Sequence, residues 1–394
     1  MSEVELKSVA DYGKDKIDAA TLNIYNYIST ENLVPNRGGI STSDYLPAKG
    51  KVSKFDIGDT LVSNIRPYFK KIWHANEIGG CSNDVIVFKP NKNKIDPKFL
   101  YYQLSKDEFF DFMMSGANGT KMPRGNKNAI PTFRLNLPPL PTQKRIATIL
   151  SAYDDLIENN LKRIKLLEEI AQRTYEEWFV KFRFNGEHLP VAEATGLPVG
   201  WKYESFNNIV EIISGFPFKS GDYVQDGKFK IVTIKNVQDG YFVTETTDSL
   251  LEIPNKVKAE QVLHTSDIIV SLTGNVGRIC LVYGDNYLLN QRVAKVIPLD
   301  EYSKAYVYFL LRSKAMITSL ENLSNGAAQQ NLSPINMGNM KVNIPEKKMI
   351  MKFGELANSI IDLISTLNLE NQKLKQSRDI LLPRLMSGTI NVES

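Results

Sequence analysis

The sequence predicts an α+β fold in which two similar globular α/β domains are separated by two long antiparallel coiled-coil helices, with a pseudo-twofold internal repeat. Three observations support this fold class. The second half of the chain repeats the first at a nearly constant offset. Each half passes from short β-branched segments through a short helical segment to a long, proline-bounded helical segment. Each long segment has apolar residues at alternating spacings of three and four, which is the pattern of a coiled-coil helix.

The internal repeat is visible as matching residues in one register. Residues 59–63 (DTLVS) fall on residues 267–271 (DIIVS) after a shift of 208. A shift of 207 then places Tyr101 on Tyr308, and residues 155–157 on residues 362–364, both of which read DLI. One register with a single one-residue slip is typical of a duplicated structural unit.

The expected strands and short helices follow from local patterns. Short β-branched segments bounded by Gly, Asn or Pro are typical of strands. Strands are predicted at residues 60–62, 84–88, 230–234, 268–272 and 294–297. Residues 99–104 and 306–311 fit either an amphipathic helix or a buried strand. We favour helices because the apolar positions continue at helical spacing.

The two long helices are predicted to carry one apolar seam each. After residues 138–141 (PPLP), no Pro or Gly occurs before Gly186. The seam positions are Leu150, Tyr153, Ile157, Asn160, Ile164, Leu167, Ala171, Thr174 and Trp178 in the first helix, and Leu356, Ile360, Leu363, Leu367, Glu370, Leu374, Ser377 and Leu381 in the second. Helices of roughly 35–40 residues would be on the order of 55 Å long. Their seams would most simply pack on each other.

These elements divide the chain into four parts. The first globular domain is expected at residues 1–141 and the central long helix at 142–186. A linker and the second globular domain occupy residues 187–346, and the distal long helix occupies 347–394. The linker contains Pro and Gly, so the second domain begins near Trp201.

Composition and charge limit the classes of function. The 394 residues include 48 Lys and Arg against 44 Asp and Glu, so nucleic-acid binding would have to rest on local basic patches. The two cysteines are far apart and the three histidines occur singly. We therefore expect no disulfide framework and no metal site built from Cys or His. Without a signal peptide or a long apolar run, we expect a cytoplasmic protein with no membrane contact.

No constellation of catalytic residues is apparent. The sequence lacks the Gly-rich phosphate loops, the GxSxG elbow, the HExxH motif and the Asn-Pro-Pro-aromatic motif of adenine methyltransferases. Acidic pairs such as Asp154 and Asp155 lie on a predicted helix, where adjacent residues point about 100° apart. They therefore favour a solvated or partner-facing surface over a carboxylate dyad. We expect this chain to have no catalytic residues and to bind no metal or cofactor.

Polar and basic loops recur at matched positions in the two halves, while their residues differ. Residues 64–71 (NIRPYFKK) correspond to 272–278 (LTGNVGR), and residues 118–127 (NGTKMPRGNK) correspond roughly to 325–331 (NGAAQQN). Arg can bind guanine and Asn or Gln can bind adenine through paired hydrogen bonds, whereas Lys mostly holds phosphate. Two domains that bind different DNA sequences would be expected to share loop positions and to differ in the residues of those loops. The alternatives are solvated basic loops and Asn-Gly or Thr-Gly turns.

The candidate DNA-binding residues of these loops are Asn64, Arg66, Lys70, Lys71, Asn118, Thr120, Lys121, Arg124, Lys127, Thr273, Asn275, Arg278, Gln329, Gln330 and Asn331.

Several segments resemble one known protein family. Residues 135–146 (LNLPPLPTQKRI), 197–201 (LPVGW) and 382–388 (LPRLMSG) are similar to the start of the first conserved helix, the opening of the second target-recognition domain and the close of the distal helix in specificity subunits of type I restriction–modification systems. Residues 213–219 (ISGFPFK) and 234–237 (IKNV) resemble early motifs of that second domain. They add Lys219, Lys235 and Asn236 to the DNA-binding candidates. The resemblance is weakest before Asp59.

The resemblance implies a function and a set of partners. Each domain would be a target-recognition domain that reads one half of a split site in double-stranded DNA, and the helices would set the spacer. Two methyltransferase subunits, which bind S-adenosylmethionine and methylate adenine N6, would dock on the helices. Motor-nuclease subunits would complete the restriction enzyme. Trp178, Phe179 and Phe182 are candidate docking residues, with core packing as the alternative.

Other functions remain open at this point. A coiled-coil scaffold that binds only protein would also need two long helices. A specificity chain of a differently organised restriction–methylation system would share the same sequence features. A self-sufficient nuclease or methyltransferase would require an active site that no motif indicates.

Overall fold

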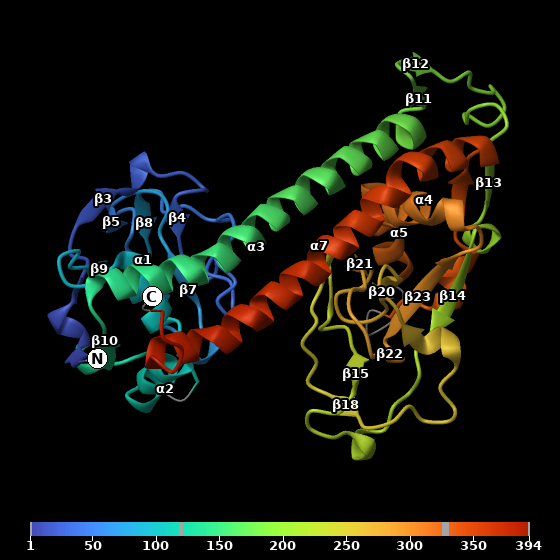
Figure 1. Ribbon diagram of the computed structural model, residues 1–394. Coiled ribbons are helices and arrows are strands. Elements are labelled where there is room, and N and C mark those ends of the chain that lie inside the picture. Colours follow the sequence, from blue (N-terminus) through green and yellow to red (C-terminus); the bar gives the residue numbers. More distant parts are fainter. Residues whose placement is uncertain (1, 118–120, 325–330, 393–394) are drawn as a thin grey trace. The chain divides into compact units, whose positions relative to one another are not determined.

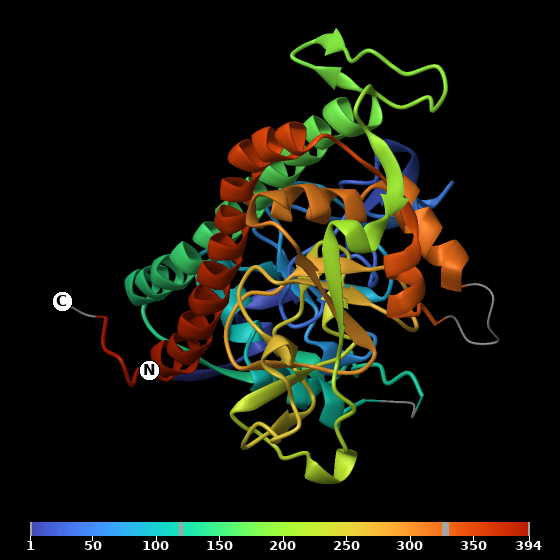
Figure 2. The same cartoon turned by 90° about the vertical axis from the view of Figure 1, so that its right-hand side faces the viewer.

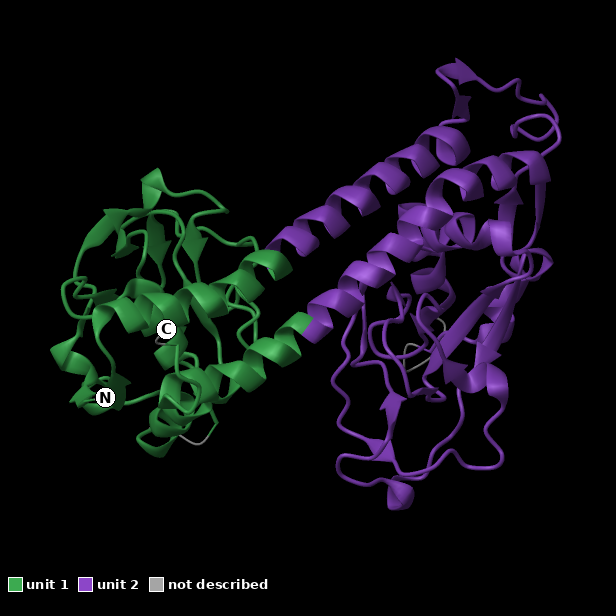
Figure 3. Cartoon of the chain, viewed as in Figure 1, with its two compact units in different colours: residues 1–157, 374–394 green, residues 158–373 purple. Residues whose placement is uncertain are grey.

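The computed structural model describes residues 2–117, 121–324 and 331–392. The chain divides into two compact units (Figure 3). Unit 1 comprises residues 1–157 and 374–394, and unit 2 comprises residues 158–373.

Unit 1 is built on two four-stranded sheets and a strand pair (Figure 1). The first sheet has the order β2-β9-β6-β7 and is antiparallel. The second sheet has the order β3-β5-β8-β4, with β4 parallel to β8. The elements are β1 (Ser2–Glu5) paired with β10 (Arg134–Leu137), β2 (Ala10–Tyr12), β3 (Lys16–Asp18), β4 (Tyr27–Ile28), β5 (Lys51–Phe55), β6 (Thr60–Ser63), β7 (Ile72–His74), β8 (Gly79–Cys81), β9 (Val85–Pro90), α1 (Pro97–Leu104) and α2 (Asp107–Ser115).

Unit 2 also has two four-stranded sheets, and its first sheet has the strand order of the first sheet of unit 1, whereas the second sheets differ in their outer strands. One sheet has the order β14-β23-β20-β21, and the other has the order β18-β15-β22-β19, with β15 parallel to β22. The elements are β13 (Lys202–Ser205) paired with β24 (Lys341–Ile344), β14 (Val210–Ser214), β15 (Phe229–Val232), β16 (Val237–Gln238), β17 (Tyr241–Phe242), β18 (Ser249–Leu250), β19 (Val262–Leu263), β20 (Ile268–Ser271), β21 (Ile279–Leu281), β22 (Tyr287–Leu289), β23 (Val293–Pro298), α4 (Lys304–Leu311), α5 (Lys314–Ser324) and α6 (Pro334–Asn339).

Corresponding elements of the two units lie at the offsets seen in the sequence. Strand β6 begins at Thr60 and β20 at Ile268, 208 residues later. Helix α1 begins at Pro97 and α4 at Lys304, 207 residues later. The five predicted strands are confirmed as β6, β9, β15, β20 and β23, with ends that differ by one or two residues, and both predicted short helices are confirmed as α1 and α4.

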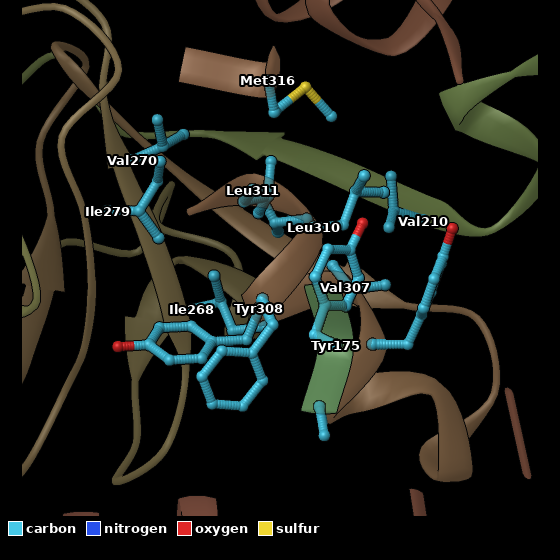
Figure 4. Close-up of a cluster of buried hydrophobic side chains, with 14 of the residues drawn as sticks. Tyr175, Val210, Ile268, Val270, Ile279, Val307, Tyr308, Leu310, Leu311 and Met316 are labelled. Carbon is cyan, nitrogen blue, oxygen red and sulfur yellow. The ribbon is translucent and has the colours of Figure 1, made fainter. Parts of the chain in front are cut away.

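The main core of unit 2 lies between its first sheet and helix α4. Every residue of α4 after Lys304 is buried, which is expected of a helix that is apolar all round. Val307 and Leu311 of α4 lie in one cluster with Ile268 and Val270 of the sheet (Figure 4). Unit 1 has an equivalent core around Phe99 and Leu100 of α1.

Two long helices, α3 (Leu140–Tyr175) and α7 (Lys347–Ser387), contribute residues to both units. In unit 2, Asn160 donates to Asn371 at 3.0 Å and the Tyr175 ring lies 6.1 Å from that of Phe353. Figures 1 and 2 show these parts of the helices side by side. Higher numbers on α3 meet lower numbers on α7, so the helices run antiparallel there.

The same antiparallel pairing occurs within unit 1. Arg145 donates to the carbonyl of Val392 at 3.1 Å, and Asp154 forms an ion pair with Arg378 at 2.5 Å. Ile146, Ala147 and Leu150 of α3 are buried with Leu382, Leu385 and Met386 of α7.

The predicted seam of α3 is confirmed at its central positions. The predicted seam of α7 is confirmed at Leu367, which is buried, but is wrong by one residue at Leu356 and Leu363. Asn160 and Ile164 are buried as expected. On α7, Leu356 is 47% exposed and Leu363 is 37% exposed, whereas the neighbours Ala357 and Ile364 are buried. Leu and Ile occur on several faces of α7, so spacing alone did not fix its rotation.

A tertiary contact explains the rotation of α7. Gly354 lies so close to α4 and its preceding turn that an added Cβ would stand 2.1 Å from the carbonyl oxygen of Tyr302. The stripe through Phe353 and Ala357 therefore faces the core.

Candidate nucleic-acid interface

Three segments of unit 1 meet where β6 ends and β9 begins. The Asn64 amide donates to the carbonyl of Asp84 at 2.8 Å, and the Gly125 amide donates to the carbonyl of Asn64 at 3.1 Å. An antiparallel β-bridge joins Ile65 to Arg124. The two loops that the sequence singled out in the first half are thus held together by backbone hydrogen bonds.

Unit 2 repeats these contacts at equivalent positions. The Leu272 amide donates to the carbonyl of Arg292 at 3.0 Å, and the Leu332 amide donates to the carbonyl of Leu272 at 2.8 Å. An antiparallel β-bridge joins Thr273 to Asn331. Each position lies 207 or 208 residues after its unit 1 counterpart. We call these residues the loop frame: Asn64, Ile65, Asp84, Arg124 and Gly125 in unit 1, and Leu272, Thr273, Arg292, Asn331 and Leu332 in unit 2.

Several polar groups of the loop frame and its neighbours have no partner within the part of the chain that the structure describes. They are the buried side-chain atoms Asn64 Oδ1, Arg66 Nε and Thr273 Oγ1. Buried polar groups are nearly always hydrogen-bonded, so each unsatisfied one needs an explanation. Arg66 also has a left-handed backbone, with φ of 50°. Strain and unsatisfied polar groups together are typical of a binding surface.

The cations of the β6–β7 loop of unit 1 are held by other residues. Lys70 Nζ lies 2.8 Å from a carboxylate oxygen of Asp107. Lys71 donates to the carbonyl of Thr30 at 2.6 Å, and burial lowers the pKa of Lys71. These contacts stabilise the loop, so both lysines have a structural role in addition to any contact with DNA.

The second loop of unit 1 is more open. Lys121, Arg124 and Lys127 are exposed. Arg124 forms an ion pair with Asp84 at 3.3 Å, with their side chains 54% and 40% exposed. Lys127 donates to the carbonyl of Asn83 at 3.2 Å. This loop therefore presents positive charge to solvent, as a phosphate-binding surface requires.

In unit 2, the β20–β21 loop holds one arginine among amide groups. Arg278 donates through its guanidinium to the side chain of Gln238. The side-chain oxygen of Asn275, when it faces the guanidinium, accepts from both terminal nitrogens of Arg278 at 3.2 and 3.1 Å. Gly274 and Gly277 have φ of 74° and 78°, a conformation that favours glycine. A shallow pocket beside Asn275 and Arg278 is also lined by Asp239, Glu321 and Ser324.

One predicted DNA-binding residue of unit 2 is structural instead. Asn236 is only 2% exposed. Its side-chain oxygen accepts from the Thr233 amide at 2.9 Å, and its nitrogen donates to the carbonyls of Val243 and Glu245 at 2.9 and 2.8 Å. All its hydrogen-bonding groups are thereby used inside a turn, which corrects the prediction. Lys219 and Lys235 are exposed.

The expected docking role of Phe179 is also corrected. Phe179 is 4% exposed, and its ring lies 4.9 Å from that of Tyr306 and 5.3 Å from that of Phe353. It belongs to the core of unit 2 and cannot reach a partner while that core is intact. Trp178 and Phe182 are half-buried against the same core, and for them docking remains a prediction.

Four candidates, Asn118, Thr120, Gln329 and Gln330, lie outside the described residues. Two positions of the loop frame, half-buried Asp84 and exposed Arg292, were not among the residues predicted from the sequence. The sequence did contain an indication of their role. The 208-residue shift places Asp84 on Arg292, so an acidic residue in one half corresponds to a basic residue in the other. Each was assigned to a strand or to its edge and was therefore not considered as a loop residue.

Within the described residues, no group of three His, Cys, Asp or Glu side chains could hold a metal ion. No helix among them is long and apolar enough to cross a membrane.

Comparisons with known proteins identify relatives along nearly the whole chain. Residues 1–169 and 198–376 match the family model for the type I restriction modification DNA specificity domain. The chain is 25% identical to the specificity subunit of the type I restriction enzyme HindI from Haemophilus influenzae, over 99% of this chain and 100% of that protein. It is 27% identical to the MjaVIII specificity subunit from Methanocaldococcus jannaschii, over 96% of this chain and 89% of that protein.

A solved structure shows the same fold. The S subunit of a type I restriction–modification system from M. genitalium has a TM-score of 0.60 and 17% identity, and the match covers 98% of this chain and 96% of that one.

Proposed function

The chain belongs to the family of type I restriction modification DNA specificity domains, and from this premise we propose that each unit reads one part of a divided target in double-stranded DNA. The loop frame is the observation that carries this proposal. The same backbone hydrogen bonds hold loops in both units, while the side chains on those loops differ in charge and type. A shared support with different side chains suits two readers of different base sequences, because base edges in the major groove are read by side-chain hydrogen bonds.

The proposal includes the origin of the two units and the role of the long helices. The common strand order of the first sheets and the nearly constant offset support a duplication. Helices α3 and α7 contribute residues to both units, and their buried stripes face each other within each unit. We propose that they form an antiparallel coiled coil whose length sets the spacer between the two parts of the target.

Exposed apolar side chains on α3 support docking of a partner. Leu166 and Ile170, one turn apart, are 58% and 57% exposed. Apolar side chains that gather on one helix face often mark a protein interaction site. The proposed partners are two methyltransferase subunits that carry S-adenosylmethionine and methylate adenine N6, with motor-nuclease subunits in the full cytoplasmic complex. On this proposal the chain selects the site, and its partners perform the chemistry.

The first test is a map of modified bases in DNA from cells that carry the cognate methyltransferase subunit, with and without this chain. We expect a split motif of methylated adenine only when the chain is present. A contiguous motif would contradict the two-reader proposal while retaining DNA recognition. No difference between the maps, with both proteins expressed, would favour a protein-binding scaffold.

A second test addresses the spacer. Seven residues are inserted into α3 after residue 157 and into α7 after residue 373, where each helix passes from one unit to the other in sequence. A heptad keeps each buried stripe nearly in phase. We expect a changed spacer length with the same bases in both parts of the motif. An unchanged spacer would contradict the role of the helices.

A further inference from the structure

We infer that the two outer positions of each loop frame form a base-reading pair: Asp84 with Arg124 in unit 1, and Arg292 with Asn331 in unit 2. This inference rests on the proposed function, since it names the residues that distinguish one half of the target from the other. Arg124, Arg292 and Asn331 are exposed, and Asp84 is half-buried with 40% of its side chain exposed.

The backbone at these positions is fixed in the same way in both units. Asp84 stands at the third position of a turn in which the Val85 amide donates to the Ser82 carbonyl at 3.0 Å. The equivalent turn of unit 2 has Val293 donating to Asn290 at 2.9 Å, with Arg292 at its third position. Both turns lead directly into the central strands of their sheets, β9 and β23.

The frame uses only the backbone of the outer positions. The carbonyls of Asp84 and Arg292 accept from the middle segment, and Arg124 and Asn331 join it by β-bridges. Their side chains are therefore free to vary without loss of the frame. A position whose side chain takes no part in the backbone support can change its residue while the loop keeps its place, as a specificity position requires.

The two outer side chains of unit 1 lie on the same side of the middle segment, and we infer the same for unit 2 from its equivalent backbone contacts. In unit 1 this is visible directly, because Asp84 and Arg124 form an ion pair across it at 3.3 Å while both remain at least 40% exposed. In unit 2, Arg292 and Asn331 occupy the same two backbone positions and are both exposed. At these two positions, unit 1 therefore has an aspartate and an arginine, and unit 2 has an arginine and an asparagine.

The two pairs suit different bases. Arg bonds to guanine O6 and N7, Asn to adenine N6 and N7, and Asp accepts from cytosine N4. The Asp84–Arg124 pair therefore fits a G·C base pair, with the carboxylate also orienting the guanidinium. The Arg292–Asn331 pair fits a guanine beside an adenine. Each unit would draw part of its selectivity from this difference.

Exchange of the pairs tests the inference. One double variant, D84R/R124N, gives unit 1 the pair of unit 2, and the other, R292D/N331R, does the reverse. The complete chain, assembled with its methyltransferase subunits, is used to select duplexes from a randomised double-stranded DNA pool. We expect each double variant to change bases in one half of the selected motif and to leave the other half unchanged.

The conservative variant Arg292→Lys separates base reading from phosphate binding, because Lys keeps the charge but cannot make the planar paired contact. We expect affinity for the preferred half-site to fall about 10- to 100-fold, while affinity for unrelated duplexes and its salt dependence stay the same. Lys202→Ala removes a positive charge outside the loop frame, on β13, and should leave the motif unchanged. Circular dichroism with thermal melting verifies that each variant is folded.

The outcomes separate the inference from the proposed function. If the unaltered complex selects no motif, the proposed function fails and the inference falls with it. If the unaltered complex selects a split motif and both exchanges leave it intact, the inference alone is overturned. It is also overturned if Arg292→Lys retains full selectivity while Arg292→Ala weakens binding to all duplexes alike, since that is the behaviour of a phosphate contact.

Discussion

Unit 1 places three cations and two aromatics in the loop after β6, whereas unit 2 places two glycines, a threonine, an asparagine and an arginine in the equivalent loop. The backbone hydrogen bonds beneath the two loops are nevertheless the same. In unit 1, acids orient the cations, as Asp107 does for Lys70 and Asp84 for Arg124. In unit 2, amides of Gln238 and Asn275 surround Arg278 instead. Equivalent backbone contacts can thus support loops with two different sets of side chains, because the sheet fixes only where the loops begin and end.

A second comparison concerns how each unit is fastened to α3. Both units use a largely buried arginine, a carboxylate of α3 and a tyrosine of a short helix. In unit 1 these are Arg378 of α7, Asp154 and Tyr102. In unit 2 Arg312, which directly follows α4, pairs with Glu168 at 2.8 Å and also donates to Tyr308 of α4 at 2.9 Å. The residues of the two sets do not lie at positions matched by the offset of 207 or 208 residues.

Breaking one of these ion pairs should have the largest effect on stability. Arg378→Ala leaves the Asp154 carboxylate, only 28% exposed, without its cation. We expect unit 1 to lose about 3 kcal/mol of unfolding free energy, since removal of one partner of a buried pair strands the other charge. Urea denaturation followed by hydrogen exchange in α1 and α4 would report on each unit separately.

Two variants sharpen this result. Arg378→Met with Asp154→Leu replaces the pair by apolar side chains and should be close to neutral. Arg173→Ala removes an arginine that is 80% exposed and lies 3.9 Å from Glu169, and we expect a loss below about 0.5 kcal/mol. Equal losses in the Arg378 and Arg173 variants would contradict the argument.

Strands β7 and β21 differ at one buried cross-strand pair. Thr60 faces His74 in unit 1, and Ile268 faces Leu281 at the equivalent place in unit 2. Within the described residues, Thr60 Oγ1 and His74 Nδ1 have no hydrogen-bond partner. Burial lowers the pKa of His74 to about 4. The folded state therefore holds a neutral imidazole that the unfolded state protonates more readily.

This difference predicts acid sensitivity in unit 1. The unfolded chain takes up a proton below pH 6.5 and the folded chain only below about pH 4, so stability is complete above pH 6.5 and falls as the pH drops towards 4. His74→Leu should remove roughly 2–3 kcal/mol of this decline. Thermal melting at several pH values measures it, and the difference between the variant and the unaltered chain cancels contributions from other groups. Parallel pH curves for the two proteins would show that His74 contributes nothing.

A DNA-binding variant tests whether the two units read independently. Arg278→Ala removes the arginine of the β20–β21 loop, and we expect a loss of about 1–3 kcal/mol for the half-site of unit 2. Preference at the other half-site should not change. Titration with duplexes that vary one half-site at a time provides the measurement. Loss of preference at both half-sites together would contradict independent reading.

The smallest effect is expected for an exposed lysine of unit 1. Lys121 lies in the open loop after α2 and would contact phosphate. Lys121→Ala should weaken binding to all duplexes by less than about 1 kcal/mol and reduce the slope of log affinity against log salt by about one. Lys162→Ala on α3, where Lys162 pairs with Glu158, serves as the control of equal charge. A loss confined to one sequence would assign Lys121 to base contact instead.

Much of the fold could be predicted because its signals are local. The strands near Thr60 and Ile268 appear as β-branched runs at one offset, and the seam through Asn160 appears as a heptad pattern. The loops around Arg66 and Arg278 could be matched because the repeat carries their order along the chain. Family resemblance in segments such as 382–388 pointed to DNA specificity, and the comparisons confirm that function.

Other features depend on contacts between residues far apart in the chain, and the spacing of residues along the sequence does not predict such contacts. The turn that buries Asn236 is closed by carbonyls of Val243 and Glu245, and Phe179 is buried by rings of Tyr306 and Phe353. Local periodicity therefore determines which segments are helices, strands and loops. Long-range packing decides which face of α7 is buried and which loop side chains stand free, because both depend on what lies opposite each residue.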